Sequence, residues 1–302
     1  MRHLLVILFA ITAVTSSLYG QEKEKDVTYT VIKNVKVFDG TSEQLKDGPV
    51  LIENNLIKAI GPQVNIPDGA IEIDGKGGTV IPGLIDMHAH HVIHEGMLEG
   101  RNSYDQMAMG AMTGERLRDY LDQGFTTSRD AGGNISSVAK AVRLDRIPGP
   151  RIYSSGGFIS QTGGHADTGM VTDQLGDRDI LARSGFGHIV DGKAEVIQAV
   201  RHNLRGGATQ IKVMAGGGVA SEFDPIHMSQ FTYDEMKAAV DVAEDYGTYV
   251  LVHAYHDRAV NRAIDAAGCG PIKGKLPATG EQLLCRALPK HAAIIIERAV
   301  LG

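Results

Sequence analysis

The chain has 302 residues, of which 43% are hydrophobic and 22% are charged, with 37 glycines, two cysteines and a formal net charge of -6. This composition excludes a disordered chain, which would be poorer in apolar residues, and a disulfide scaffold, which would be richer in cysteine. The negative charge gives no reason to expect a nucleic-acid partner, and no apolar run reaches the roughly 18 residues of a membrane-spanning helix. The length fits one large or two ordinary domains.

Residues 1–20 have the pattern of a secretory signal peptide. A short basic start at Met1-Arg2-His3 is followed by an apolar run over 4–14 and a stretch of small residues that ends near Gly20. We expect this segment to be cleaved and the protein to be exported to the periplasm or secreted. The alternative is an uncleaved anchor, for which the apolar run is too short to span a bilayer.

Residues 28–80 are rich in short strand patterns. Two apolar arms, 49–53 and 56–60, flank Asn54–Asn55, a pair typical of a hairpin turn. Strand patterns recur about every ten residues, which predicts a small β-sandwich domain over 28–80.

Strand and helix patterns alternate from Gly78 onward. The residue pattern predicts strands over 79–87, 125–128, 151–155, 210–214 and 248–253, and helices over 114–123, 136–144, 193–206, 232–246 and 258–267. Thr232 and Glu235 have the spacing of a capping box at a helix start. This alternation predicts an α/β fold with a parallel sheet, either doubly wound or closed into a barrel.

His88 and His90 follow the first of these apolar strands. Residues i and i+2 of a strand point to the same face, so both imidazoles could bind one metal ion at the carboxyl end of the strand. His91 and His94 add nitrogen donors nearby. The alternative interpretation is a polar histidine cluster on a loop.

Lys212 lies within the apolar strand 210–214, and Gly216–Gly218 follow it. A lysine inside a core strand is costly unless it is paired, and burial lowers the pKa of such an amine. A neutral amine can react with carbon dioxide to give a carbamate whose two oxygens bridge two cations. The alternative is a lysine at the mouth of the strand that reaches water.

His253 ends the next predicted strand, 41 residues after Lys212. A single histidine in this position is often a core or loop residue. Three strand ends that carry His88 and His90, Lys212 and His253 are instead typical of a hydrolytic metal centre.

The segment Ile81-Pro-Gly-Leu-Ile-Asp-Met-His-Ala-His90 resembles the metal-dependent amidohydrolase superfamily, and within it the imidazolonepropionase-like and Xaa-Pro or Xaa-Arg dipeptidase-like group. The segments 32–40, 124–132, 149–156 and 162–167 are similar to the same family. The resemblance covers about residues 28–267. It implies a (β/α)8 TIM barrel, here incomplete after about the fifth strand, with an N-terminal β-sandwich domain.

The resemblance also implies a site. His88 and His90 would bind one of two divalent metal ions, His253 the second, and carboxylated Lys212 would bridge them. Zinc is the expected metal, although the same ligands accept manganese, cobalt or iron. A metal-activated hydroxide would attack an amide carbonyl, while His165 and Tyr255 would contact the substrate; the alternative for these two residues is a structural role. We interpret Arg129 and Asp130 as structural, and Asp86 as pointing away from the site.

The pattern departs from the family after Ala267. The family supplies a further histidine after the sixth strand and an aspartate after the eighth, and no aspartate follows Asp265 here. No catalytic residue is therefore assigned, and residues 268–302 form an atypical tail beyond the barrel segment 81–267. We expect a reading frame that ends early, near residue 267.

Three interpretations follow. The first is a hydrolase of carbon–nitrogen bonds in dipeptides or non-peptide amides, and the second is an inactive truncated fragment that retains partial metal binding. The third, a dinucleotide-binding protein suggested by Gly216–Gly218, lacks the G-x-G-x-x-G fingerprint. The expected partner is a small-molecule amide or dipeptide, without nucleic acid or stable membrane insertion, and the sequence is compatible with a homo-oligomer.

Overall fold

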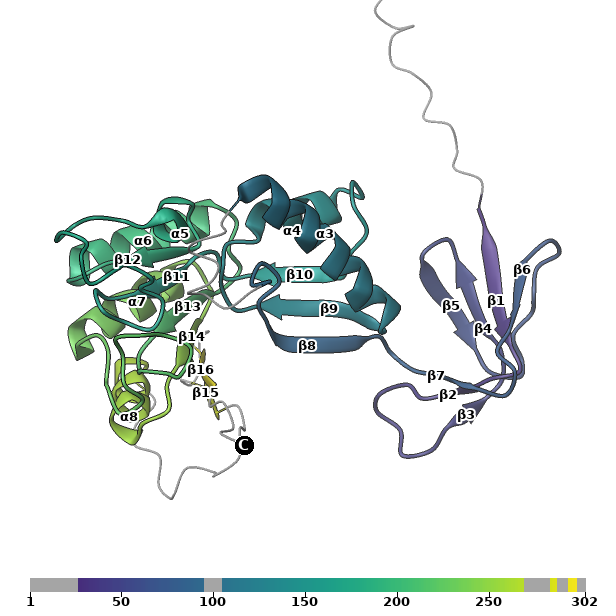
Figure 1. Cartoon of the computed structure of the whole chain (residues 1–302). Coiled ribbons are helices and arrows are strands. Elements are labelled where there is room, and N and C mark those ends of the chain that lie inside the picture. The colour runs from purple at the N-terminus through teal and green to yellow at the C-terminus, as the bar shows by residue number, and fades with distance from the viewer. Residues whose placement is uncertain (1–26, 95–104, 269–282, 287–292, 298–302) are drawn as a thin grey trace, which may run out of the picture. The chain divides into compact units, whose positions relative to one another are not determined.

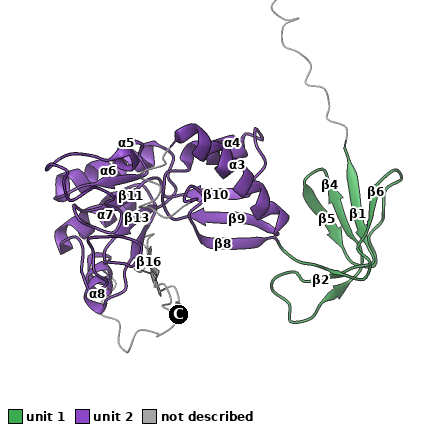
Figure 2. Cartoon of the chain, in the orientation of Figure 1, with its two compact units in different colours: residues 1–82 green, residues 83–302 purple. Residues whose placement is uncertain are grey.

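The computed structural model describes residues 27–94 and 105–268, together with the backbone of two strands at 283–286 and 293–297. The predicted signal peptide, 1–20, lies outside the described residues. The chain divides into two compact units, Met1–Pro82 and Gly83–Gly302 (Figure 2). This division falls two residues beyond the predicted end of the N-terminal domain at residue 80.

The first unit contains two small sheets. One has the order β5-β4-β1-β6 and the other β3-β2-β7. The strands are β1 (Tyr29–Lys33), β2 (Lys36–Val37), β3 (Lys46–Asp47), β4 (Val50–Glu53), β5 (Leu56–Ile60), β6 (Ile71–Asp74) and β7 (Thr79–Val80). The hairpin predicted at Asn54–Asn55 is confirmed, because β4 and β5 are antiparallel and Asn54 has a positive φ of 55°. That these two sheets form a sandwich stays a prediction.

The second unit begins with a parallel three-stranded sheet in the order β10-β9-β8 (Figure 1). Its strands are β8 (Leu84–Ala89), β9 (Phe125–Asp130) and β10 (Arg151–Ser154). A second sheet has the order β12-β11-β13-β14-β16-β15 and is parallel except for β15. Its strands are β11 (Phe158–Ser160), β12 (Gly187–Ile189), β13 (Ile211–Met214), β14 (Val250–His253), β15 (Leu283–Arg286) and β16 (Ala293–Glu297).

Two strands lie in the segment 268–302, for which no sequence pattern predicted a structure. The backbone of β16 pairs in parallel with β14, and β15 pairs with β16. The described part of the segment thus extends the sheet beyond the fifth predicted strand.

The helices of the second unit follow the predicted alternation. They are α3 (Gln106–Asp122), α4 (Ser136–Arg143), α5 (Ile180–Arg183), α6 (Lys193–Arg205), α7 (Tyr233–Asp245) and α8 (Asp257–Ala266). The capping box is confirmed, since Thr232 and Glu235 bond each other's backbone at the start of α7. The start predicted for α3 at residue 114 is wrong, because Asp105 caps the helix by accepting from Met107 and Ala108 N–H. No helix among the described residues is long and apolar enough to cross a membrane.

Along β13 and β14, side chains alternate between the sheet face that packs on the helices and the opposite face. Ile211 and Val213 pack with residues of α6, α7 and α8 in the main apolar cluster, as do Val250 and Val252. Because successive strand side chains point to opposite faces, Lys212 and His253 face away from these helices. The main core therefore fixes the strands while leaving their other face to polar groups.

The chain passes from the first sheet to the second at residues 155–157, between β10 and β11. Gly156 has φ +72°, and the Asn203 side chain of α6 bonds both backbone groups of Gly157, at 3.1 Å and 2.8 Å. Gln210 Nε2 donates to the carbonyl oxygens of Asp130 and Tyr153, at 3.1 Å and 2.9 Å. These polar contacts join the two sheets. The sequence patterns predicted neither this break nor β11, β12 and α5.

Candidate active site

Two imidazoles lie together at the carboxyl end of β8. His88 Nε2 and His90 Nε2 are 3.0 Å apart, and the ring centroids are 4.9 Å apart. The prediction that both side chains occupy the same face of the strand is confirmed. Their tautomers decide which nitrogen donates, and a metal ion is an alternative partner for both nitrogens.

Lys212 brings an amine to the same place from β13. Its side chain is among the most completely buried in the protein, with 1% of the residue exposed. Lys212 Nζ lies 3.5 Å from His88 Nε2, although the two residues are 124 positions apart in sequence. The alternative in which Lys212 reaches water at the strand mouth is therefore excluded.

His253 joins these residues from the end of β14. Its Nε2 lies 3.3 Å from the Gly217 carbonyl oxygen. Burial, followed by the proximity of His165 and Lys212, holds the pKa of His253 well below its usual range. The ring is consequently neutral at pH 7, which is the form that binds metal ions.

The donor separations can be compared with the geometry of a metal centre. Two nitrogens each about 2.05 Å from a tetrahedral zinc ion are about 3.3 Å apart. The 3.0 Å separation of His88 Nε2 and His90 Nε2 is close to that value, whereas a carboxylated Lys212 would bind through its carbamate oxygens and not through Nζ. Among the described residues, no three His, Cys, Asp or Glu side chains are grouped so as to hold a metal ion. Among the described residues, Lys212 is therefore the additional side chain that could complete a ligand set with these histidines.

His165 and Tyr255 both lie against His253. The rings of His165 and His253 are stacked, with centroids 3.9 Å apart and an interplanar angle of 8°. The Tyr255 ring meets His253 edge-on at 5.1 Å, and burial raises the pKa of its hydroxyl. The two residues for which we predicted substrate contacts are thus adjacent to the predicted metal ligands.

The other histidines of the same segment do not join this group. His91 Nε2 lies 2.7 Å from Ser128 Oγ, and burial lowers the pKa of His91 to about 4. His94 Nε2 lies 3.0 Å from Thr113 Oγ1 of α3. In both rings, Nε2 thus contacts a hydroxyl of the neighbouring strand or helix.

Asp130, Arg129 and Asp86 have contacts typical of structural residues. Asp130 accepts from the backbone N–H groups of His91 and Gly132, and burial raises its pKa to about 7. Arg129 Nε donates to the Met87 carbonyl oxygen at 2.7 Å. Asp86 accepts from the Tyr120 hydroxyl of α3 at 2.9 Å, as expected for a side chain directed away from the site.

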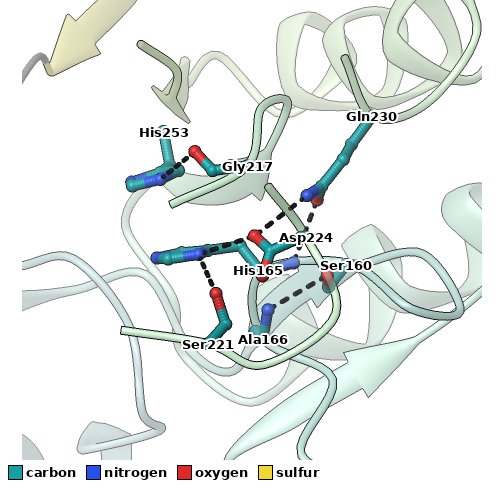
Figure 3. A network of polar contacts seen from close by, with 8 residues as sticks. All are labelled: Ser160, His165, Ala166, Gly217, Ser221, Asp224, Gln230 and His253. Atoms are coloured by element: carbon teal, nitrogen blue, oxygen red, sulfur yellow. Dashed lines mark hydrogen bonds and ion pairs between the residues drawn. The ribbon is translucent and has the colours of Figure 1, made fainter. Parts of the chain in front are cut away.

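The loop after β13 contributes three residues that the sequence analysis missed. His165 Nδ1 lies 2.9 Å from Asp224 Oδ2 and 2.7 Å from Ser221 Oγ, and Gln230 contacts both Asp224 and the His165 backbone (Figure 3). The sequence feature that could have indicated this loop is the run Gly216–Gly218, because glycines allow other groups to approach the backbone closely. A Cβ on Gly218 would lie 2.0 Å from the His165 ring, and one on Gly217 would lie 2.1 Å from the Pro225 carbonyl oxygen. The glycines permit close packing and do not mark a nucleotide site.

Residues 79–300 match the model of the amidohydrolase family. This match covers most of the chain, and the chain belongs to that family. Its solved relatives give the second unit a TIM-barrel-like α/β fold, to which the parallel sheets described above correspond. Members of this family generally use divalent metal ions.

Three relatives illustrate the similarity. Ochratoxinase from Aspergillus niger is 33% identical over 261 residues, which are 81% of this chain and 54% of that protein. The structure of a prolidase complexed with N-methylphosphonate-L-proline has 38% sequence identity and a TM-score of 0.74, covering 79% of this chain and 59% of that one. The structure of a Xaa-Pro dipeptidase has 31% identity and a TM-score of 0.69, covering 79% and 60%. The chain thus spans about half the length of the curated relative and three fifths of the two solved structures.

Proposed function

We propose that the protein is a metal-dependent hydrolase of carbon–nitrogen bonds in dipeptides or other small amides. The observation that carries the proposal is the convergence of His88, His90, Lys212 and His253 from the ends of three strands. Neutral imidazoles and a carboxylate-like group are suitable ligands for zinc. A divalent ion bound there would lower the pKa of a bound water to about 7 and so provide a hydroxide nucleophile.

The residues around these ligands support the same chemistry. His88 and His90 would hold one ion, His253 the second, and Lys212 both. Carboxylation of Lys212 converts a buried amine into an anion, which favours the approach of two cations. His165 and Tyr255 are the nearest candidates for contacts with the substrate, because each lies against the His253 ring.

The first substrates to test come from the names of the relatives. A prolidase and a Xaa-Pro dipeptidase are among the similar structures, so a dipeptide with C-terminal proline is the first choice. Xaa-Arg dipeptides and a non-peptide amide complete the panel. The export of the protein remains part of the proposal and is tested by N-terminal sequencing of the protein recovered outside the cytoplasm.

The test is metal analysis and turnover on the same preparation of the full chain. We expect about two equivalents of divalent metal per chain, hydrolysis of one class of amide, and loss of both after chelation, with recovery on adding zinc. Metal binding without turnover on any amide would instead support the non-catalytic alternative. Turnover that survives complete metal removal would contradict the proposed mechanism.

Carboxylation of Lys212 is tested separately by carbon-13 NMR. Protein incubated with labelled bicarbonate should show a carbamate signal that is absent from a Lys212→Arg variant. Lys237, an exposed lysine paired with Asp241, provides the matched control, because Lys237→Arg should keep the signal. A signal that persists in Lys212→Arg would assign the carbamate to another residue.

A further inference from the structure

Two close contacts restrict the plane of the His165 ring. One face of its ring stacks on His253, with centroids 3.9 Å apart. Gly218 lies so close to the ring that an added Cβ would be 2.0 Å from His165 Cε1. These contacts fix the plane of the imidazole but leave its protonation pattern undetermined, because stacking acts equally on both tautomers.

The polar contacts of the ring all fall on one nitrogen. His165 Nδ1 is 2.9 Å from Asp224 Oδ2 and 2.7 Å from Ser221 Oγ, and no hydrogen bond joins Nε2 to the described residues (Figure 3). If Nδ1 lacked a proton, its lone pair would face a carboxylate oxygen at hydrogen-bond distance, which is repulsive. The contact is favourable only when Nδ1–H donates to Asp224.

Asp224 is itself fixed in position. Its side chain has no exposed surface, and Gln230 Nε2 donates to the same carboxylate oxygen at 3.3 Å. Gln230 Oε1 also accepts from the His165 backbone N–H at 3.1 Å, and Gln230 is fully buried. The pair of Asp224 and Gln230 thus holds both the backbone and the ring of His165.

We propose that Asp224 is a positioning residue that holds His165 in the Nδ1–H tautomer and presents Nε2 to the substrate as a hydrogen-bond acceptor. The proposal deepens the proposed function and rests on it for the identity of the substrate. An Nε2 acceptor binds a donor group, so His165 selects amides that carry an N–H or ammonium group at this point. A neutral ring in this state cannot donate a hydrogen bond from Nε2 to an oxyanion.

The tautomer is measured directly by nitrogen-15 NMR of the full chain labelled at histidine. The His165→Gln variant identifies the signal among the 12 histidines. We expect Nδ1–H in the native protein and a substantial Nε2–H population in Asp224→Ala and Asp224→Leu. Leu has a branched shape similar to that of Asp but no acceptor, so Asp224→Leu fills the space if the Ala variant fails to fold. A native His165 signal with a proton on Nε2, whether in the neutral ring or in the imidazolium, or an unchanged Nδ1–H signal in Asp224→Leu, would overturn the proposal.

Kinetics provide the second measurement. Asp224→Leu should lower turnover at least tenfold, whereas Asp241→Leu, at an exposed position on α7, should retain native turnover within threefold. Equal losses in both variants would mean that the loss is not specific to Asp224. A native chain that hydrolyses no amide would refute the proposed function but would leave the NMR result valid, so the two failures are distinguishable.

Discussion

Two regions of the second unit supply residues to the candidate site, and they differ in how deeply their strands are buried. β13 is buried along its length and β14 over Val250–Val252, and α6, α7 and α8 pack against them. On β8, by contrast, the apolar side chains of Leu84, Ile85 and Met87 are 43%, 59% and 43% exposed. Lys212 and His253 therefore come from the best packed strands, and His88 and His90 from one of the least covered.

The candidate ligands therefore come together although the strands that carry them are packed to different degrees. A buried strand fixes Lys212 and His253 through its own core contacts, whose loss costs several kcal/mol. The end of β8 is instead held by polar contacts, including the bond from His91 N–H to Asp130 and that from Tyr120 to Asp86. The two halves of the site should respond differently to substitution, and four experiments test this.

Removal of the amine from the buried region should have the largest effect. Lys212→Ala eliminates the side chain that could complete a ligand set with the histidines, so kcat/KM should fall about 1,000-fold or more, equivalent to about 4 kcal/mol. Steady-state kinetics with metal analysis measure this loss. Lys237→Ala, on the exposed face of α7, should be silent. Retained activity in Lys212→Ala would contradict the assigned ligand set.

A matched pair of leucines compares the packing directly. Leu251 on β14 is 0% exposed and Leu84 on β8 is 43% exposed. Leu251→Ala should lower the free energy of unfolding by about 3 kcal/mol, and Leu84→Ala by less than about 1 kcal/mol. Urea denaturation of both variants measures the difference. Equal losses would mean that β8 is covered to the same extent as β14.

The polar end of β8 should appear in the pH dependence of stability. Burial lowers the pKa of His91 to about 4, so below pH 6.5 the unfolded chain binds a proton that the folded chain does not. This group therefore removes stability as the pH falls, by about 2 kcal/mol at pH 5. His91→Gln should flatten the decline relative to the native chain, whereas His202→Gln, at an exposed position, should not. Parallel pH profiles for the native chain and His91→Gln would refute the assignment.

The smallest effect is expected at the start of α7, in the buried region. Thr232→Ala removes the half of the capping box in which Thr232 Oγ1 accepts from the Glu235 N–H, leaves the backbone N–H that donates to Glu235, and should cost about 1 kcal/mol. Thermal or urea unfolding is sufficient to detect it. Lys237→Ala, which breaks only an exposed pair with Asp241, should cost less than about 0.5 kcal/mol. A larger loss at Lys237 would reverse the expected order of these contributions.

Sequence patterns predicted those features that depend on local periodicity. The parallel strands, the capping box of α7 and the face shared by His88 and His90 follow from periods of two and 3.6 residues. Lys212 and His253 could be assigned to the same site because parallel strands end at one edge of a sheet.

Contacts made by loops could not be predicted in this way. Asp224 meets His165 from 59 residues away, and no period relates two loop residues. The break between β10 and β11 was missed because it depends on Asn203 of α6, a tertiary contact that overrides the local strand pattern. The start of α3 was missed because Asp105 lies well ahead of the periodic apolar residues.

The break at residues 155–157 also determines how the protein should open. The backbone ladder is interrupted there, and side chains of Asn203 and Gln210 bridge the interruption. We expect amide hydrogens of β8–β10 to exchange with solvent through opening of that sheet alone, and those of β13 and β14 to exchange through global unfolding. The two pairs of predicted ligands would belong to different cooperative folding units, and the lifetime of the assembled site would be set by the weaker unit.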